Sequence, residues 1–249
     1  MTRDVSVDVD GHVAVVEMHR PPTNFFDEAL LGAIGQALFE VDENPDVRAV
    51  VLCAEGRHFC AGADLRNVDS HGLRRVYRKA FALFSTRKPI VAAVQGAAIG
   101  GGVGLALAAD FRVATPETRF SVNFAKLGFH QGFGISVTLP AVVGQQKALD
   151  LLYTGRAVRG TEAHEIGLVD RLAEDDPRPA ALDFAKDIAA SAPMSLVAIR
   201  ATMRRALNAQ VHAALDQEAA AQTVLLDSKD LREGIDASIG KREPQFVGA

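Results

Sequence analysis

GAAIGGGVGLALAAD, residues 96–110, follows the apolar run PIVAAV (89–94) and places five glycines in nine positions. Removing side chains where a buried strand meets a helix lets another group approach the backbone closely. A phosphate-binding P-loop would end in Gly-Lys-Ser/Thr, and a dinucleotide fold would show Gly-x-Gly-x-x-Gly; the stretch has neither. Two interpretations remain, a ligand held against the backbone and tight packing of the helix on its strand.

A second small-residue turn favours the ligand. HFCAGADL, residues 58–65, comes after RAVVLCA (48–54), which is predicted to be another buried strand. Two such turns after neighbouring strands can aim two backbone amides at one point. Paired amides of this kind form an oxyanion hole, which stabilises negative charge that develops on a carbonyl oxygen.

Composition excludes several classes of protein. The 249 residues are 48% hydrophobic and 23% charged, and the net charge of −4 gives no reason to expect nucleic acid as a partner. No apolar run approaches the roughly 20 residues of a membrane span, and the first residues lack a signal-peptide core. Cys53 and Cys60 make no disulfide framework, and no cluster has metal-ligand spacing. We therefore expect a cytoplasmic protein without a metal.

Strand and helix patterns alternate along most of the chain, which predicts a layered α/β core. Residues 5–20 read as a hairpin that turns at Asp10-Gly11. Strands are predicted at 48–54, 89–94 and 111–114, and helices at 27–41, at 73–84 and from within the glycine run. From about residue 180 the sequence becomes alanine-rich and helical. We therefore divide the chain into an α/β core over 1–190 and a helical region over 191–249.

Four stretches together resemble the crotonase superfamily, which is the enoyl-CoA hydratase/isomerase family. They are HFCAGADL, PIVAAVQGAAIGGGVGLALAADFRVAT, TGRAVRGTEAHEIGLVDRL and GKREPQF, and they follow the family's order over essentially the whole chain. The resemblance implies a core of repeated ββα units and a C-terminal helical region that forms trimers or dimers of trimers. It also implies an acyl-CoA thioester as the ligand, with coenzyme A as part of the substrate and no separate cofactor.

The resemblance also assigns roles to residues. It places the two oxyanion amides at Ala61, in the A-G-A-D stretch, and at Gly101, the middle glycine of the triplet. Asn24 matches the asparagine of an R-P-x-x-N segment near the coenzyme A, and Lys241 matches a terminal lysine that reaches a neighbouring subunit's phosphates. An ordinary solvated charge is the alternative for Lys241. The remaining predicted substrate-binding residues are Gly62, Ala63, Asp64 and Phe124.

Two carboxylates of the family's hydratases are replaced in this chain. Such hydratases carry one glutamate two residues after the glycine triplet and another in a later F-x-x-x-E stretch, and the pair activates the water that is added. Here the two positions hold Gly104 and Phe124, neither of which can transfer a proton. Hydration by the two-glutamate mechanism is therefore not expected, and isomerisation that uses the second glutamate is equally doubtful.

Other candidates for acid–base chemistry come from segments around the same cavity. His130, in LGFHQGFG (127–134), titrates near neutral pH and could serve as the acid or base; a subunit contact or solvent exposure is its alternative. Asp64 is more typical of a structural carboxylate, and Cys60 of a small buried side chain. His71 and Tyr77 are expected over the acyl group.

Two functions from different classes follow. One is a lyase or isomerase that uses the oxyanion hole on an acyl-CoA, with its acid or base outside the usual glutamate positions. The other is a non-catalytic acyl-CoA carrier or sensor that retains the fold and the pocket. Loss of both glutamates favours the second hypothesis without excluding the first, and Phe124 favours an apolar or aromatic acyl group.

Overall fold

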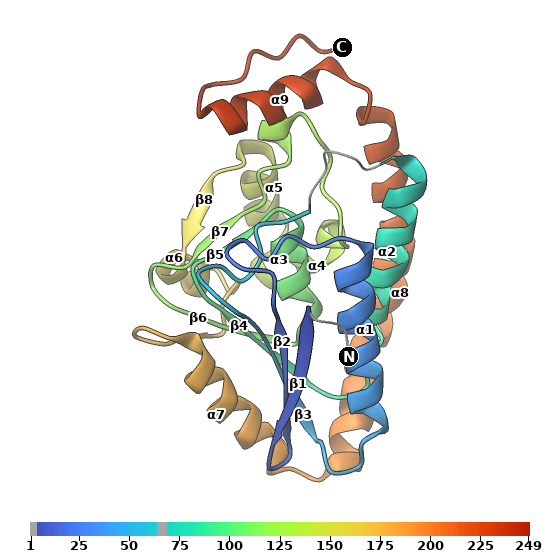
Figure 1. The fold of residues 1–249 in the computed structure, drawn as a ribbon, viewed down its shortest axis with the longest axis vertical. Coiled ribbons are helices and arrows are strands. Elements are labelled where there is room, and N and C mark those ends of the chain that lie inside the picture. Colours follow the sequence, from blue (N-terminus) through green and yellow to red (C-terminus); the bar gives the residue numbers. More distant parts are fainter. Residues whose placement is uncertain (1–3, 64–68) are drawn as a thin grey trace.

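A twisted six-stranded sheet runs through the middle of the molecule (Figure 1), in a computed structural model that describes residues 4–63 and 69–249. Its order is β1-β2-β3-β4-β6-β9, and every neighbouring pair is parallel except the hairpin β1–β2. The strands are β1 (Val5–Asp10), β2 (Val13–Met18), β3 (Ala49–Ala54), β4 (Ile90–Val94), β6 (Phe111–Ala114) and β9 (Arg171–Leu172). The predicted hairpin and the three predicted strands are confirmed.

Helices cover both faces of this sheet. On one face Ala49, Val51 and Cys53 of β3 pack toward α7 (Pro177–Ala189), whose alanines let it approach closely. On the other face Val50 and Leu52 join the main core, which includes α1 (Glu28–Glu43) and α2 (Ser70–Phe84). All six residues of β3 are buried, as expected for a parallel strand covered on both sides.

The glycine run contributes a strand of its own as well as a helix. β5 (Ala97–Ile99) pairs with β7 (Arg119–Ser121), which pairs with β8 (Ala157–Arg159), so a second, three-stranded sheet lies beside the first. α3 (Gly101–Ala108) begins two residues after β5 ends and is almost completely buried. The next elements are the short 3-10 helix η1 (Ala125–Leu127), α4 (Ile135–Val143), α5 (Gln145–Thr154) and α6 (Gly160–Glu165).

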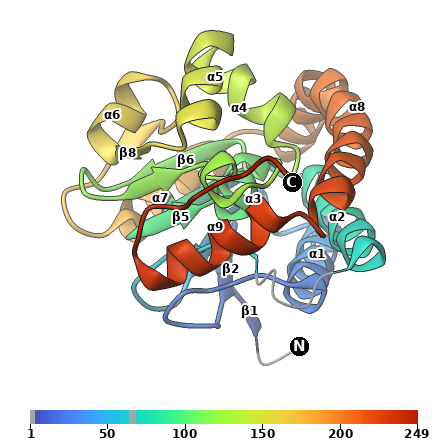
Figure 2. The same ribbon diagram turned by 90° about the horizontal axis from the view of Figure 1, so that it is seen from above.

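The C-terminal region is helical, as predicted, and it shares the core of the rest of the chain. α8 (Pro193–Leu225) packs along α2 and α4, and its Val211, Leu215 and Ala219 belong to the main core. α9 (Lys229–Gly240) lies across the top of the molecule, next to η1 (Figure 2). The predicted division at 190/191 falls in the turn between α7 and α8. Within the described residues, no helix is long and apolar enough to cross a membrane.

Candidate active site

A cavity of about 640 Å³ lies among the two glycine-rich turns, α2, η1, the loop before α4 and the underside of α9. Aromatic rings supply much of its wall, and these are Phe25, Phe26, Phe124, Phe129 and Phe133. Ile235 and Ile239 of α9 complete the apolar lining from above. The cavity therefore suits an apolar group.

The two glycine-rich turns meet at one wall of this cavity. Gly62 has a φ of +104°, and a Cβ built on it would lie 3.0 Å from the Ile99 carbonyl oxygen and 4.0 Å from the Gly101 nitrogen. A bridge between Cys60 and Ala98 holds the turns in register. Glycine is thus required where the chain approaches itself, and the approach brings backbone amides of both turns together.

The amide that the resemblance assigns to Ala61 is already engaged. The Ala61 N–H donates to the Thr23 carbonyl at 2.8 Å, which corrects the predicted role of this residue as an oxyanion donor. Ala63, two residues on, lines the same cavity, and its N–H makes no hydrogen bond to the described residues. Gly101 also lines the cavity, and as the first residue of α3 its N–H has no acceptor within the helix.

Position 104 offers no room for an acid. A Cβ built on Gly104 would lie 2.5 Å from the Phe133 Cβ and 2.9 Å from its Cγ, so the phenylalanine occupies the space above this glycine. Phe133 is fully buried with a φ of +64°, between Gly132 and Gly134, and its ring packs edge-on against Phe26 with centroids 5.2 Å apart. The side chain that occupies the space beside Gly104 thus comes from 29 positions further along the chain.

Phe124 lines the cavity from the start of η1 and is 9% exposed. Both positions at which the resemblance predicts a hydratase glutamate therefore have apolar surroundings here. A carboxylate at either place would be desolvated next to aromatic rings, which disfavours its charged form.

Two other predicted residues lie away from the cavity. Asn24 is fully buried: its Oδ1 accepts from the Arg20 N–H, and its Nδ2 donates to the carbonyls of Glu55 and His58. It therefore positions the turn before HFCAGADL and has both amide hydrogens engaged within the chain. Lys241 is exposed at the C-terminal end of α9, with a φ of +52°.

The predicted acid or base His130 is not among the residues that line the cavity in the described part of the chain. Its Nδ1 donates to the Gln131 carbonyl at 2.7 Å. Gly62 and Ala63, which are predicted to bind substrate, line the cavity, whereas Asp64 lies outside the described residues. His71 lines a separate hollow, between α2 and α8.

Tyr77 brings a polar group into the cavity, on the side of α2. Its hydroxyl donates to Oε1 of Gln222, and Nε2 of Gln222 donates to the His130 carbonyl at 2.8 Å. Burial raises the pKa of the Tyr77 phenol, so the hydroxyl keeps its proton. Sequence reasoning expected Tyr77 near the acyl group but missed Gln222, which lies 145 residues away on α8.

The carboxylates at the cavity mouth are held by other partners. Asp27 caps α1 through the Leu30 N–H and pairs with Arg20 at 2.8 Å. Glu28 pairs with Arg75 at 2.7 Å. Both carboxylates are therefore engaged by arginine side chains beside the cavity.

A metal site and a reactive thiol each place requirements on the described residues. Within residues 4–63 and 69–249, no three His, Cys, Asp or Glu side chains are grouped so that they could hold a metal ion. Cys60 is fully buried, and burial raises the pKa of its thiol to about 12, so the reactive thiolate is suppressed at neutral pH.

Comparison with known proteins defines the family. The enoyl-CoA hydratase/isomerase family matches residues 8–249, so the chain belongs to this family. A Bacillus subtilis protein described as a probable enoyl-CoA hydratase is 34% identical, with 98% of each chain covered. The 1,2-epoxyphenylacetyl-CoA isomerase of Escherichia coli is 31% identical, with 96% of this chain and 97% of the relative covered. The crystal structure of an enoyl-CoA hydratase/isomerase from Pseudoalteromonas atlantica superimposes with a TM-score of 0.89 at 31% identity, covering 98% of this chain and 100% of the other.

Proposed function

We propose that the chain acts on an acyl-CoA thioester, whose carbonyl oxygen accepts hydrogen bonds from the backbone N–H groups of Ala63 and Gly101. The observation that carries this proposal is the close approach of the two glycine turns at the cavity wall, where Gly62 lies beside the Gly101 nitrogen. Donors fixed before the reaction stabilise an enolate-like oxyanion, each by about 3 kcal/mol. This assignment keeps Gly101 and replaces Ala61 by Ala63, because the Ala61 amide is bonded to Thr23.

The proposed reaction is not a two-glutamate hydration. Gly104 is covered by Phe133, and Phe124 presents a ring, so no carboxylate at these positions can activate water. The related proteins carry names for different reactions on acyl-CoA compounds, a hydratase and an isomerase among them. The step that we propose in common with these reactions is therefore polarisation of the thioester carbonyl. The second candidate function is a carrier or sensor that binds an acyl-CoA without converting it.

Binding of the thioester is the first test. Acyl-CoA compounds should bind more tightly than the matching free acids, because an ionised acid carries its charge into a largely apolar cavity and lacks the coenzyme A contacts. Isothermal titration calorimetry with a series of acyl-CoA thioesters and free acids measures the difference. Failure of every thioester to bind at millimolar concentration would overturn the proposal.

Catalysis is tested on crotonyl-CoA. Each positioned acid or base typically contributes 10²–10⁴-fold, so without both glutamates hydration should be several orders of magnitude slower than in a two-glutamate relative. Loss of the enoyl absorbance follows the reaction, with such a relative as the control. Hydration at a rate typical of that relative would show that another group supplies both proton transfers.

The enzyme and the carrier differ in what they do to the α-carbon. An enzyme that stabilises an enolate should exchange the α-protons of a saturated acyl-CoA for deuterium faster than buffer does, and NMR in D₂O measures this exchange. Binding without faster exchange would favour the carrier.

A further inference from the structure

Tyr77 and Gln222 form a buried polar pair within a mostly apolar cavity. Tyr77 is 7% exposed and Gln222 is 2% exposed, and both line the cavity, together with Gly132. A Cβ built on Gly132 would lie 1.9 Å from the Tyr77 hydroxyl oxygen and 2.8 Å from the Gln222 Nε2. The loop before α4 therefore closes directly on the pair, and position 132 must be glycine for the pair to fit.

The pair is held in place from three elements. Gln222 comes from α8 and donates to the His130 carbonyl, while Tyr77 comes from α2. One turn earlier on α8, the Glu218 carboxylate accepts from the N–H groups of Gly134 and Ser136 at 2.7 and 2.9 Å. These bonds fix the loop and the two polar side chains relative to one another, so the pair is preorganised.

The bonding capacity of the pair is only partly used by the described residues. The Tyr77 proton goes to Gln222, which leaves the lone pairs of the phenol oxygen as acceptors. One of the two Nε2 hydrogens of Gln222 goes to His130, which leaves the other as a donor. A hydroxyl group matches both, because it donates to the Tyr77 oxygen and accepts from Gln222.

We propose that Tyr77 and Gln222 recognise a hydroxyl group on the acyl chain, so that the substrate class is hydroxyacyl-CoA rather than plain alkyl- or aryl-acyl-CoA. This inference rests on the proposed function, since it concerns the acyl end of the same thioester. Tyr77 acts here as a hydrogen-bonding group and not as a general base, because the buried phenol stays neutral. The alternative is that the pair only ties α2 and α8 to the loop.

Calorimetry with matched pairs of ligands separates these two interpretations. Butyryl-CoA is compared with 4-hydroxybutyryl-CoA, hexanoyl-CoA with 6-hydroxyhexanoyl-CoA, and phenylacetyl-CoA with its 4-hydroxy derivative. We expect the wild-type protein to bind the hydroxylated member of at least one pair about tenfold more tightly. Tyr77→Phe should abolish this preference, so that the two members of the pair bind with equal Kd values.

Tyr153→Phe is the control for effects on folding, and Gln222→Met is a second test of the pair. Tyr153→Phe changes the chain's other tyrosine, which is 75% exposed on α5, and should keep the wild-type preference. Gln222→Met retains the length of the side chain without its amide and should also abolish the preference. Equal Kd values within every pair for the wild-type protein would overturn the inference while leaving thioester binding intact. Failure of all the thioesters to bind would instead overturn the proposed function.

Discussion

Gly104 shows how the space beside a glycine is filled by a distant side chain. Phe133 occupies this space and packs edge-on against Phe26, whose own ring lies against Gly101. The single substitution Gly104→Glu would therefore drive a charged side chain into Phe133. The sequence shows directly that position 104 is a glycine, and the loss of a hydratase glutamate there stays a prediction from the resemblance. The role of Phe133 could not be predicted from the sequence, because it depends on how a distant loop folds over α3.

Alanine at position 104 measures this packing. Gly104→Ala should destabilise the fold by about 1–3 kcal/mol, because the new Cβ overlaps Phe133 in a closely packed core. Gly32→Ala is the matched control: it also lies inside a helix, α1, and its Cβ would meet only the flexible end of Lys79, at 3.7 Å. There the higher helix propensity of alanine should stabilise the fold by about 0.5–1 kcal/mol. Urea unfolding of both variants gives the comparison, and equal stabilisation by the two substitutions would contradict this view of position 104.

At the scale of elements, regular periodicity was enough to locate much of the main sheet and its helices. The hairpin, the buried strands and α1 follow from alternation, apolar runs and helical spacing, whereas Asp27, predicted as the first residue of the helix, is its N-cap. The second sheet escaped prediction because β5, β7 and β8 have three residues each, and β5 lies inside the glycine run, where no side-chain pattern exists. The hydrogen bonds of the site residues could not be predicted from the sequence for a related reason. Hydrogen bonds such as Ala61 to Thr23 depend on tertiary approach and leave no mark on the sequence.

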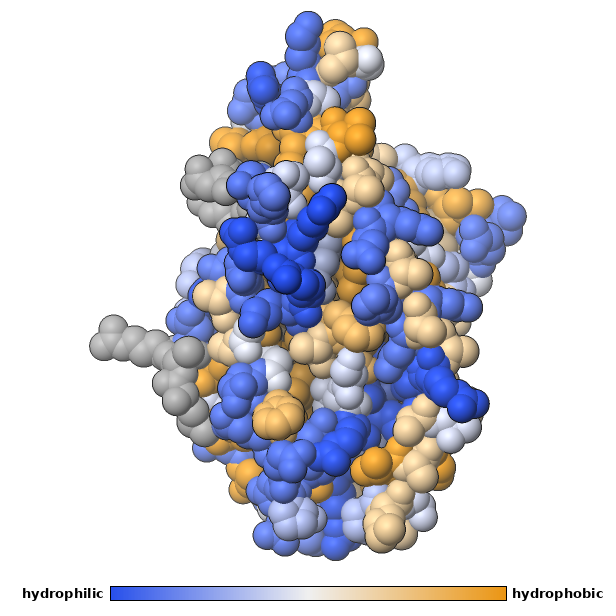
Figure 3. All heavy atoms as spheres, turned by 90° about the vertical axis from the view of Figure 1, so that its right-hand side faces the viewer, coloured by the Kyte–Doolittle hydropathy of each residue, from blue (hydrophilic) through white to orange (hydrophobic). Residues whose placement is uncertain are grey.

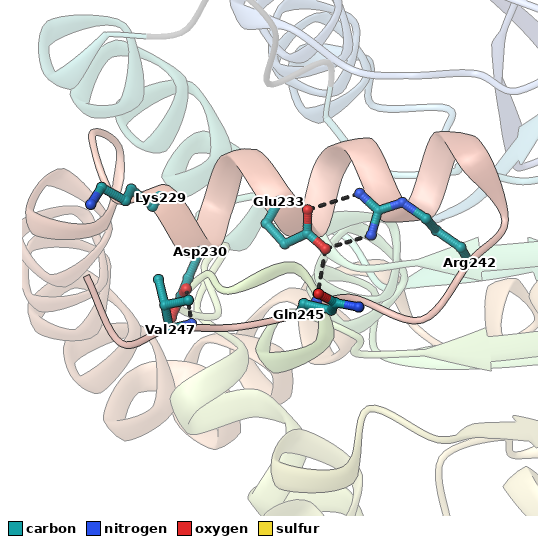
Figure 4. Close-up of a pocket in the computed structure, with 6 residues that line it drawn as sticks. All are labelled: Lys229, Asp230, Glu233, Arg242, Gln245 and Val247. Atoms are coloured by element: carbon teal, nitrogen blue, oxygen red, sulfur yellow. Dashed lines mark hydrogen bonds and ion pairs between the residues drawn. The ribbon is translucent and has the colours of Figure 1, made fainter.

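α9 makes two kinds of contact with the rest of the chain. Its backbone packs against η1, and its Glu233 side chain bonds the C-terminal segment. Against η1, Cβ atoms built on Gly128 and Gly234 would lie within 2.6 Å of backbone atoms, so the two backbones touch. On its outer side, residues 243–249 fold back along the helix (Figure 4). The Glu233 carboxylate accepts from the Arg242 guanidinium and from the Gln245 N–H at 2.7 Å. α9 thereby keeps Ile235 and Ile239 over the cavity.

The Glu233 contact has a defined pH dependence. The Arg242 hydrogen bond lowers the pKa of Glu233 from 4.5 to about 2, so its contribution is complete above pH 4.5 and disappears as the pH falls through about 2. Carboxypeptidase should therefore trim residues 247–249 equally slowly from the wild-type protein at pH 7 and pH 5. Glu233→Gln should speed trimming at both pH values, whereas Glu243→Gln, which removes a charge from the same segment, should not. Trimming of Glu233→Gln at the wild-type rate would contradict a role for this contact in holding the C-terminal segment.

At the scale of the whole molecule, α8 has one face that packs on the core and another that is exposed. Toward α2 and α4 it buries Val211, Leu215 and the Glu218–Gln222 turn that fixes the loop beside the cavity. Away from the core it leaves large apolar side chains exposed, and these are Met194, Ile199, Met203 and Val224. The side of the molecule where α2 and α8 lie accordingly shows hydrophobic patches among hydrophilic atoms (Figure 3). Assembly into trimers or dimers of trimers stays a prediction, and these side chains are where it can be tested.

Ile199 and Met203 provide that test because they are four residues apart and so lie on one face of α8. They are 60% and 75% exposed in the single chain. Light scattering after size-exclusion chromatography should give the mass of three or six chains. Met203→Asp should reduce that mass to a single chain, because it would bury an unpaired charge in the interface. Val9→Asp, at a 51% exposed apolar position on β1, should leave the mass unchanged. A wild-type protein that remains a single chain at micromolar concentration would show that the exposed face of α8 does not mediate self-association.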